Sequence, residues 1–307
     1  MKHVAVLMGG LSAERPVSLN SGAACAKALR GAGYRVTEVD VGTDVAEVLA
    51  ALKPDVAFNV LHGKYGEDGC IPGVLEVLGI AYTHSGVLAS AMAMKKDVAK
   101  VMMALNGVPV AEGVTVSRFE AARRHVMAPP YVAKPVSEGS SFGVVIVKED
   151  RSHPPQELAR ADWPYGEMML VERFIPGREL TCGVMGYRTG AKALEVIEIV
   201  SPSTAFYDYE AKYSKGGSIH VLPAKLKPNV YRQVQELSER AHEALGCRGV
   251  SRADFRYDED TETLVCLEVN TQPGMTETSL VPELAAHAGM SFGELVTWMV
   301  EDASLER

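Results

Sequence analysis

The sequence has no long run of lysine and arginine residues, and its overall charge is negative. Of the 307 residues, 39 are acidic and 31 are basic, which gives a formal net charge of -8 at pH 7. Proteins that bind nucleic acids through their phosphates normally present a basic face. The composition therefore argues against general nucleic-acid binding, and we expect no nucleic-acid partner.

Paired cysteines and long apolar runs are also missing. The five cysteines include no CxxC pair and no spacing typical of a zinc site, and their odd number fits a compartment that keeps thiols reduced. The apolar segment at residues 2–8 is too short for a secretory signal. No stretch approaches the roughly 18 apolar residues of a membrane span. We expect a cytoplasmic protein with no membrane partner.

The first part of the chain alternates between strand-like and helix-like patterns. This alternation indicates a parallel α/β sheet, in which ligand sites lie beyond the carboxyl ends of the strands. Two loops follow predicted strands at such positions, GGLSAERPVS (Gly9–Ser18) and HGKYGEDG (His62–Gly69). The predicted strands are 2–8, 34–40 and 55–61, and the predicted helices are 17–30 and 45–52.

The pattern changes at residues 106–109, after a predicted helix over 85–105, and then becomes rich in strands. A polar and aromatic stretch, Ser201–Ser218, shows little periodicity. A loop of that length in a compact chain is usually a functional flap or disordered. The predicted strands are 113–116, 131–136, 143–148, 168–174, 180–185, 250–257 and 263–270, and the predicted helices are 154–161, 228–245, 282–288 and 292–301.

Polar side chains share one face at the ends of two predicted strands near the C-terminus. Arg252 and Asp254 alternate on the first strand, and Glu268 and Asn270 alternate on the second. If these strands pair, Asp254, Glu268 and Asn270 converge, and three hard oxygen donors suit Mg²⁺ or Mn²⁺. One strand alone is explained as well by a sheet edge in which Arg252 neutralises Asp254. The two strands together favour a metal site.

Other segments have features of a nucleotide site, although each also has a plain structural explanation. In KPVSEGSSFGV, Lys134 precedes a Gly/Ser-rich turn whose N–H groups and hydroxyls could hold phosphates, yet such hairpins are common. VERFIPGRE places Glu172 and Glu179 where carboxylates could accept hydrogen bonds from ribose or adenine, or simply form a charged turn. Lys95 and Lys96, at a predicted helix start, are by themselves ordinary surface residues.

The two loops after the N-terminal strands also allow two explanations. Ser12 or Ser18 could cap a helix, and the helix dipole would favour Glu14 at its start. The glycines of HGKYGEDG indicate close backbone approach or left-handed turns, which helix capping does not explain. Taken alone, His62 is more often a structural histidine than a catalytic one.

Six motifs together resemble a known family. GGLSAERPVS, HGKYGEDG, KPVSEGSSFGV, FYDYEAKY, SRADF and LEVNTQPGMTETSLVP occur in the order seen in D-alanine–D-alanine ligases, which are members of the ATP-grasp superfamily. The resemblance extends over almost the whole chain. Pro72 stands where the family usually has Gln, and Phe174 stands where Trp is frequent. Neither departure touches the chemistry that the resemblance implies.

The resemblance implies an α/β (α+β) ATP-grasp fold with an N-terminal Rossmann-like parallel domain. The implied domains are 1–94, 95–178 and 179–307, with residues 201–218 as a lid that excludes water. In the implied reaction, ATP phosphorylates the carboxylate of one D-alanine, and the amine of a second D-alanine attacks the acyl phosphate. The product would serve peptidoglycan synthesis. The resemblance also implies a homodimer, formed through the N-terminal unit.

The resemblance further implies the residues that hold ATP and metal. Asp254, Glu268 and Asn270 would bind two Mg²⁺ ions, with Mn²⁺ as an alternative and a monovalent cation as an additional candidate. The implied ATP-binding residues are Lys95, Lys134, Glu172, Phe174, Ile175, Glu179 and Lys212.

The implied amino-acid sites take residues from every part of the chain. Glu14 would pair with the ammonium group of the first D-alanine, held by Ser140 and Tyr213. The backbone N–H of Gly274 and the side chain of Arg252 would stabilise the developing oxyanion. The second carboxylate would be bound by Ser279 and Leu280, assisted by His62.

Two rival activities stay open. One is the same scaffold joining D-alanine to D-lactate or to another D-amino acid. Relatives that join D-alanine to D-lactate typically lack the tyrosine arrangement of the EAKY segment, so Tyr213 favours an amine nucleophile. The other rival is a nucleotide sensor without catalytic activity. Loss of a metal ligand or of Arg252 would indicate a sensor, but all of these residues are present.

Overall fold

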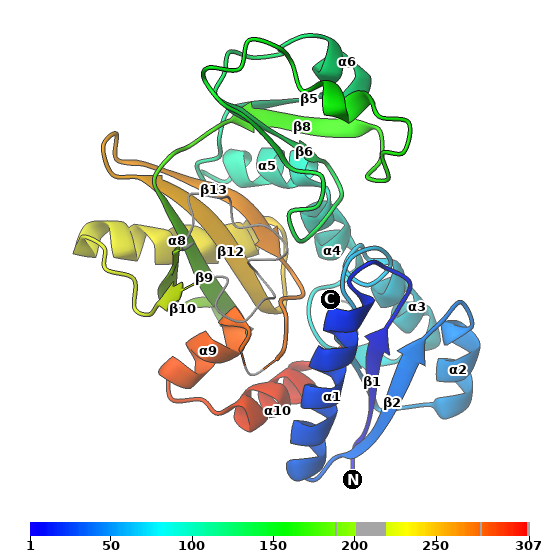
Figure 1. Ribbon diagram of the computed structural model, residues 1–307. Coiled ribbons are helices and arrows are strands. Elements are labelled where there is room, and N and C mark those ends of the chain that lie inside the picture. Colours follow the sequence, from blue (N-terminus) through cyan, green and yellow to red (C-terminus); the bar gives the residue numbers. More distant parts are fainter. Residues whose placement is uncertain (188, 201–218, 277, 306–307) are drawn as a thin grey trace.

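The computed structural model describes residues 1–187, 189–200, 219–276 and 278–305 of the chain. These residues form three sheets, which Figure 1 shows as three groups of strands. The three sheets follow the three predicted domain ranges in order, except that the strand Arg178–Tyr187 of the third sheet begins one residue before the third range, and the domain boundaries stay a prediction. No helix in the described part of the chain is both long and apolar enough to cross a membrane.

The N-terminal sheet is parallel, with the strand order β2-β1-β3-β4. Its central strand β1 is almost completely buried, because helices cover the faces of the sheet. The loops that follow β1 and β3 lie next to each other, because these two strands are paired. The elements are β1 (His3–Gly9), α1 (Arg15–Gly31), β2 (Arg35–Val41), α2 (Val45–Leu52), β3 (Val56–Asn59), α3 (Cys70–Leu78) and β4 (Ala81–Tyr82).

Two helices connect the N-terminal sheet to the rest of the molecule. The structure divides the predicted helix 85–105 into α4 (Val87–Met94) and α5 (Lys96–Leu105). The chain changes direction at Lys95, whose backbone is extended, with φ -88° and ψ 95°. Ala99 and Met103 of α5 pack into the core of the C-terminal sheet. By packing, α5 therefore belongs to the C-terminal unit, although the sequence predicts it in the central one.

The central sheet is antiparallel, with the strand order β5-β8-β6-β7. It stands apart from the other two sheets, at the top of Figure 1. The helix predicted over 154–161 is a short 3₁₀ turn, Gln156–Ala159. The other elements are β5 (Gly113–Ser117), α6 (Arg118–Arg123), β6 (Tyr131–Pro135), β7 (Val145–Val147) and β8 (Met168–Arg173).

The C-terminal sheet is also antiparallel, with the order β11-β10-β9-β12-β13. The amphipathic helix α8 (Pro228–Ala244) covers one face of it. Strand β10 was not predicted from the sequence, although Val196, Ile197 and Ile199 in its second half favour a strand; only its first half, with Ala, Lys and Glu, has a low β-propensity. The strands are β9 (Arg178–Tyr187), β10 (Gly190–Val200), β11 (Ile219–Val221), β12 (Gly249–Asp258) and β13 (Thr263–Asn270).

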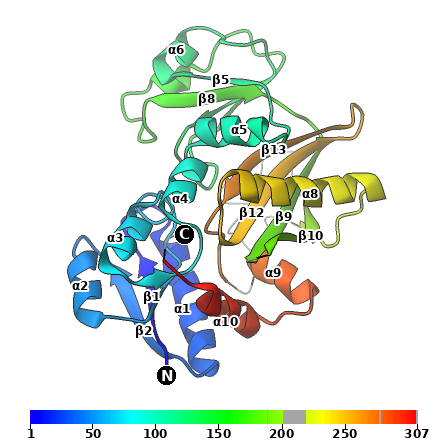
Figure 2. The same cartoon turned by 180° about the vertical axis from the view of Figure 1, so that it is seen from behind.

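The end of the chain returns to the N-terminal sheet. Helix α9 (Leu280–His287) is followed by α10 (Phe292–Asp302), which packs against α1. Val296 and Met299 of α10 share one buried core with Val4 and Val6 of β1. Figures 1 and 2 both show the C-terminus beside the N-terminal sheet. The first and third units are therefore held together by apolar packing.

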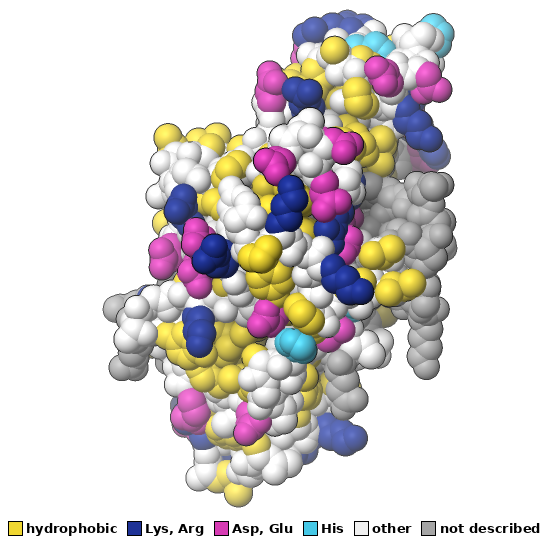
Figure 3. All heavy atoms as spheres, turned by 90° about the vertical axis from the view of Figure 1, so that its left-hand side faces the viewer, with side chains coloured by type: hydrophobic (Ala, Val, Ile, Leu, Met, Phe, Trp, Pro, Cys, Tyr) yellow, Lys and Arg dark blue, Asp and Glu magenta, His cyan; other side chains and the backbone are white. Residues whose placement is uncertain are grey.

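One broad face of the molecule carries charges of both signs. In Figure 3, Lys and Arg side chains lie among Asp and Glu side chains instead of forming one basic surface. This distribution agrees with the acidic composition of the chain.

Candidate functional site

A large cavity lies where the three units meet. Its volume is about 680 Å³, within the usual range of ligand pockets. A smaller cavity of about 90 Å³ lies between the central and C-terminal sheets. The two cavities adjoin, because five residues line both of them. The residues that line both are Lys96, Glu138, Glu179, Asp254 and Glu268.

The predicted metal residues lie at this junction. Asp254 of β12 and Glu268 of β13 are direct cross-strand partners, and Arg252 pairs with Asn270 in the same register. A β-bulge follows Asp254, and both Leu267 and Glu268 line the smaller cavity. The bulge changes the direction of the side chains at the end of the strand, so that the consecutive residues Leu267 and Glu268 both face the smaller cavity. The sequence analysis predicted the convergence but not the bulge.

Each junction carboxylate is held by a cationic side chain. Arg252 donates two hydrogen bonds to Asp254, with Nε–Oδ1 and Nη2–Oδ2 distances of 2.8 and 2.7 Å. Thr181 donates a third, at 2.6 Å. Lys96 Nζ lies 3.1 Å from Glu268 Oε2 and donates to the carbonyl oxygen of Glu138 at 2.6 Å. The sheet-edge pairing that the sequence allowed for Arg252 and Asp254 is therefore present.

The donor chemistry at the junction fits a hard divalent cation. Two carboxylates and the amide oxygen of Asn270 come from neighbouring strands and face the large cavity, and Mg²⁺ and Mn²⁺ prefer such oxygen ligands. Asn270 Oδ1 also accepts a hydrogen bond from the backbone N–H of Gln272, which fixes its orientation. Among the described residues, His, Cys, Asp and Glu side chains form no metal-binding group of three, so a three-residue set of oxygen donors at this junction would have to include the amide of Asn270.

The smaller cavity contains the residues predicted for nucleotide binding. Lys134 of β6 and Glu172 of β8 form one wall, and Phe174 and Ile175 continue from β8. Arg256 of β12 donates to the carbonyl oxygen of Ile175 at 3.2 Å and lies 3.6 Å from Glu179. Burial lowers the pKa of Arg256, and Glu179 partly offsets this effect.

The two neighbouring lysines at the start of α5 differ in position. Lys95 is exposed and lines neither cavity, whereas Lys96 lines both and contacts Glu268. Of the two lysines, only Lys96 is therefore placed to contact a ligand in either cavity, whereas the sequence analysis assigned an ATP contact to Lys95. Both lysines are present in the sequence, but only the structure, in which Lys95 is extended and α5 begins at Lys96, shows which one faces the cavity.

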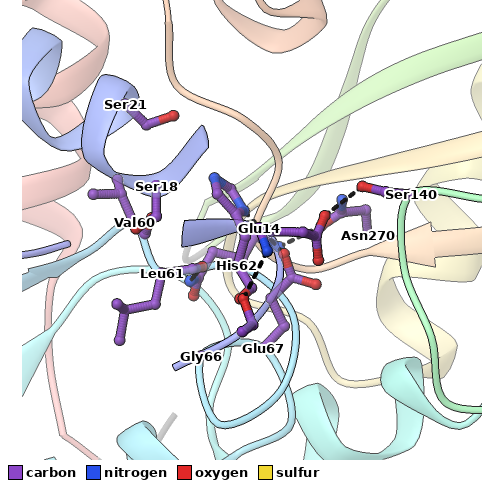
Figure 4. Close-up of polar contacts among 12 residues, drawn as sticks. Glu14, Ser18, Ser21, Val60, Leu61, His62, Gly66, Glu67, Ser140 and Asn270 are labelled. Carbon is purple, nitrogen blue, oxygen red and sulfur yellow. Dashed lines mark hydrogen bonds and ion pairs between the residues drawn. The ribbon is translucent and has the colours of Figure 1, made fainter. Parts of the chain in front are cut away.

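The two loops beyond β1 and β3 form one end of the large cavity. Glu14, just before α1, accepts a hydrogen bond from the hydroxyl of Ser140. Ser12 ties the loops together by donating to the carbonyl oxygen of His62 at 2.6 Å. Figure 4 shows Glu14 and Ser140 pointing toward each other, with His62 and Glu67 close by. Glu14, His62 and Ser140 thus lie close together, although they are far apart in sequence.

His62 is oriented by a residue that the sequence analysis did not assign. Its Nδ1 lies 3.0 Å from Glu67 Oε1, and both side chains are largely buried. The Nε2 atom of His62 has no hydrogen-bond partner in the described part of the chain. A carboxylate partner favours the proton on Nδ1, which leaves Nε2 as an acceptor.

Close backbone approach at this end of the cavity requires unusual conformations. Gly63 has a φ of +69°, and a Cβ atom there would lie 2.7 Å from Glu14 Oε2. Ser140 and Ser141 also have positive φ values, 48° and 61°. Such strain in non-glycine residues is often found at ligand sites.

The second predicted carboxylate site lies at the start of α9. Ser279 precedes this helix, its side chain makes no capping hydrogen bond, and its hydroxyl accepts from the N–H of Thr276 at 3.0 Å. A Cβ atom on Gly274 would lie 3.0 Å from Ser279 Oγ, so these two residues are in close contact. Gly274, Ser279 and Leu280 all line the large cavity. A helix N-terminus is a suitable place for an anion.

A buried pair of amide side chains connects the segment after β13 to the His62 loop. Gln272 donates through Nε2 to the carbonyl oxygen of Leu61 and accepts from Asn59 Nδ2 at 2.9 Å. No local pattern predicts this contact, because the partners are 213 residues apart.

Lys212 and Tyr213 were also predicted to belong to the site, and they lie outside the described residues, as does the predicted lid at 201–218.

Two family models match this chain. "D-ala D-ala ligase C-terminus" matches residues 102–301, and "D-ala D-ala ligase N-terminus" matches residues 44–85. The chain belongs to the D-alanine–D-alanine ligase family. The predicted family and its ATP-grasp fold are confirmed.

Relatives in this family match over the full length. The D-alanine–D-alanine ligase of Xanthobacter autotrophicus is 69% identical, and that of Methylocella silvestris is 68% identical. Each alignment covers 100% of this chain and 99% of the relative. A crystal structure of D-alanine–D-alanine ligase from Bacillus anthracis complexed with ATP has a TM-score of 0.81 at 27% identity, covering 98% of this chain and 97% of the other.

Proposed function

We propose that this chain is an ATP-dependent ligase that joins two D-alanine molecules for peptidoglycan synthesis. The observation that carries the proposal is that Asp254 and Glu268 line both cavities. Phosphates of a nucleotide in the smaller cavity and the carboxylate of an amino acid in the larger one would meet at these residues. The ATP-bound relative from Bacillus anthracis supports a nucleotide in this fold.

The proposed reaction has two steps. A carboxylate oxygen of the first D-alanine attacks the γ-phosphorus of ATP, which forms D-alanyl phosphate and releases ADP. The amine of the second D-alanine then attacks the acyl carbon, a C–N bond forms, and the C–O bond to phosphate breaks. The amine loses a proton, and phosphate leaves with an oxygen that came from the carboxylate.

The nucleotide would be held by the walls of the smaller cavity. Lys96 and Lys134 would contact the phosphates, and Lys212 would approach from outside the described residues. Glu172 and Glu179 would accept hydrogen bonds from adenosine, with Phe174 and Ile175 along the base. Because about 90 Å³ is less than a typical ligand pocket, nucleotide binding requires the walls of this cavity to move apart.

Asp254, Glu268 and Asn270 are the residues that would hold two Mg²⁺ ions, with Mn²⁺ as an alternative. The ions would neutralise phosphate charge during phosphoryl transfer. In the structure, Lys96 and Arg252 balance the two carboxylates. Ion binding would therefore free Arg252 to turn toward the reacting carboxyl group.

The amino acids would occupy opposite ends of the larger cavity. Glu14 would bind the ammonium group of the first D-alanine, with Ser140 and Tyr213 fixing its position. Arg252 and the N–H of Gly274 would stabilise the oxyanion on the acyl carbon. Ser279, the N–H of Leu280 and Nε2 of His62 would orient the second D-alanine.

The activity is tested by phosphate release from ATP and Mg²⁺ in the presence of D-alanine, D-lactate or both, with mass analysis of the product. We expect phosphate and D-alanyl-D-alanine with D-alanine alone. A requirement for D-lactate would identify a D-alanine–D-lactate ligase instead. Nucleotide binding without turnover under any of these conditions would favour a sensor.

We also propose a cytoplasmic homodimer. ATP is available in the cytoplasm, and all five cysteines of the structure are free thiols. Helices α3, α4 and α5 are in contact and expose aliphatic side chains that would be covered by a second copy. Sedimentation equilibrium tests the dimer, and a monomer at micromolar concentration would refute it. The exposed side chains are Val77, Leu88, Val98, Val101 and Leu105.

A further inference from the structure

A buried carboxylate in the nucleotide site is shared by two lysines. Lys134 Nζ lies 2.5 Å from Glu172 Oε1, and Lys100 Nζ donates a hydrogen bond to Glu172 Oε2. The three side chains are only 9, 8 and 4% exposed for Lys134, Lys100 and Glu172. They come from three elements, β6, α5 and β8. Two ammonium groups therefore surround one carboxylate in a water-poor space.

The two lysines differ in their access to the nucleotide site. Lys134 and Glu172 line the smaller cavity, whereas Lys100 lies behind Glu172 and lines neither cavity. Lys100 can thus influence a bound nucleotide only through Glu172. Lys134 would therefore contact the nucleotide, whereas Lys100 would support Glu172 from behind.

We propose that Lys100 is a positioning residue that keeps Glu172 ionised and oriented as the acceptor for the exocyclic amine of adenine. This inference rests on the proposed nucleotide site. With Lys100 in place, Lys134 can turn from Glu172 to a phosphate oxygen while the buried carboxylate keeps one cationic partner. Without Lys100, the same movement would leave a buried charge unpaired, which is strongly unfavourable.

The charges of the cluster support this assignment. Burial raises the pKa of the Glu172 carboxyl group, but Lys134 and Lys100 lower it more, so that the pKa lies below its usual value. The cluster also carries one more positive than negative charge. That excess prepares the site for a polyphosphate, which Lys134 can reach and Lys100 cannot.

A purely structural role for Lys100 makes a different prediction. A residue that only fastens α5 to β8 would alter protein stability and affect the binding of all nucleotides equally. A residue that acts through Glu172 would change the preference for adenine over a purine with a carbonyl group at the same ring position. A carboxylate accepts a hydrogen bond from the adenine amine but repels the guanine carbonyl oxygen.

The test is isothermal titration calorimetry on the full chain with the non-hydrolysable analogues AMP-PNP and GMP-PNP. The measured quantity is the ratio of the two dissociation constants. We expect Lys100→Met and Glu172→Gln each to reduce the adenine preference by about tenfold or more. The double variant should show no further loss, because Lys100 acts through Glu172. Met103→Ala, a buried change on the same helix, should leave the ratio unchanged.

The possible outcomes separate this inference from the proposed function. An unchanged ratio in Lys100→Met, together with a reduced ratio in Glu172→Gln, would overturn the inference and leave the nucleotide site intact. An unchanged ratio in Glu172→Gln would overturn it as well. Wild-type protein that neither binds AMP-PNP nor releases phosphate would contradict the proposed function itself. If Lys100→Met does not fold by circular dichroism, Lys100→Gln and the double variant provide the same comparison.

Discussion

At the scale of single residues, the site depends on which cation faces each carboxylate. Asp254 is paired with Arg252 and Glu268 with Lys96, at the junction of the two cavities. Such pairs orient the two carboxylates, and in the proposed function divalent ions would replace the side-chain cations. The same lysine and arginine would then be available to phosphate and to the reacting carboxyl group.

Replacing Lys96 tests this arrangement. We expect Lys96→Met to reduce kcat/KM for ATP by about 10- to 100-fold, because a charge-assisted phosphate contact is lost. Lys95→Met is the matched comparison, since Lys95 is exposed and lines neither cavity. Steady-state phosphate release at varied ATP measures both. If Lys95→Met shows the larger loss, the phosphate contact belongs to Lys95, as the sequence alone implied.

Sequence reasoning predicted residues whose chemistry is visible in a local pattern. The alternation of Asp254, Glu268 and Asn270 needed only strand geometry. Lys100, Glu67 and Gln272 were not assigned a role, because their significance depends on partners in other elements. A buried Lys cannot be told from a surface Lys in one sequence until α5 is placed against β8.

At the scale of elements, most helices and strands follow the predicted periodicity, and the exceptions have local causes. The strand at 263–270 and the helix at 45–52 have the predicted bounds. The break at Lys95 interrupts an otherwise continuous helical pattern, and an extended residue there leaves no sequence signal such as Pro or Gly. Strand β10 was missed although its second half is rich in Val and Ile, because its first half, GAKALE, has the composition of an exposed helix.

Helix α8 packs on its sheet through a buried histidine. His242 Nδ1 lies 2.7 Å from Ser251 Oγ of β12. Burial lowers the pKa of His242 to about 4, so the folded state holds this side chain neutral. Below pH 6.5 the unfolded chain binds a proton that the folded chain does not, and stability must fall as the pH decreases.

We expect the free energy of unfolding to decrease by about 2 kcal/mol more between pH 7.5 and 5 in the wild type than in His242→Gln. Urea denaturation at several pH values measures this difference. His287→Gln is the control, because His287 is exposed and should retain the wild-type pH dependence. Parallel pH profiles for the wild type and His242→Gln would contradict the assignment.

At the scale of the whole molecule, the shape of the large cavity depends on a core that joins the two ends of the chain. Strand β1, helix α1 and helix α10 contribute to it, together with Met185 of β9 and Val250 of β12. The sequence predicted three units in order, but it could not show that the last helix packs on the first sheet. That contact helps to bring the Glu14 and His62 loops to the same cavity as Asp254 of β12 and Glu268 of β13.

A shared core predicts that these two units unfold together. We expect Met299→Ala to lower the free energy of unfolding by about 2–5 kcal/mol, because it leaves a cavity in the core. In a Trp163→Phe background, which leaves Trp298 as the one tryptophan of the sequence, tryptophan fluorescence and far-UV circular dichroism should lose their native signals at the same urea concentration. Glu149→Ala, at an exposed position outside this core, should change stability by less than about 0.5 kcal/mol. Separate transitions for the two probes would refute a shared core.

The central claim is that the cleft activates one amino-acid carboxylate as an acyl phosphate. The most direct measurement uses D-alanine labelled with ¹⁸O in its carboxyl group, together with ATP and Mg²⁺, and mass analysis of the released phosphate. We expect one labelled oxygen in the phosphate for each D-alanyl-D-alanine formed from fully labelled D-alanine. Unlabelled phosphate accompanying the dipeptide, or phosphate released without any dipeptide, would contradict the account.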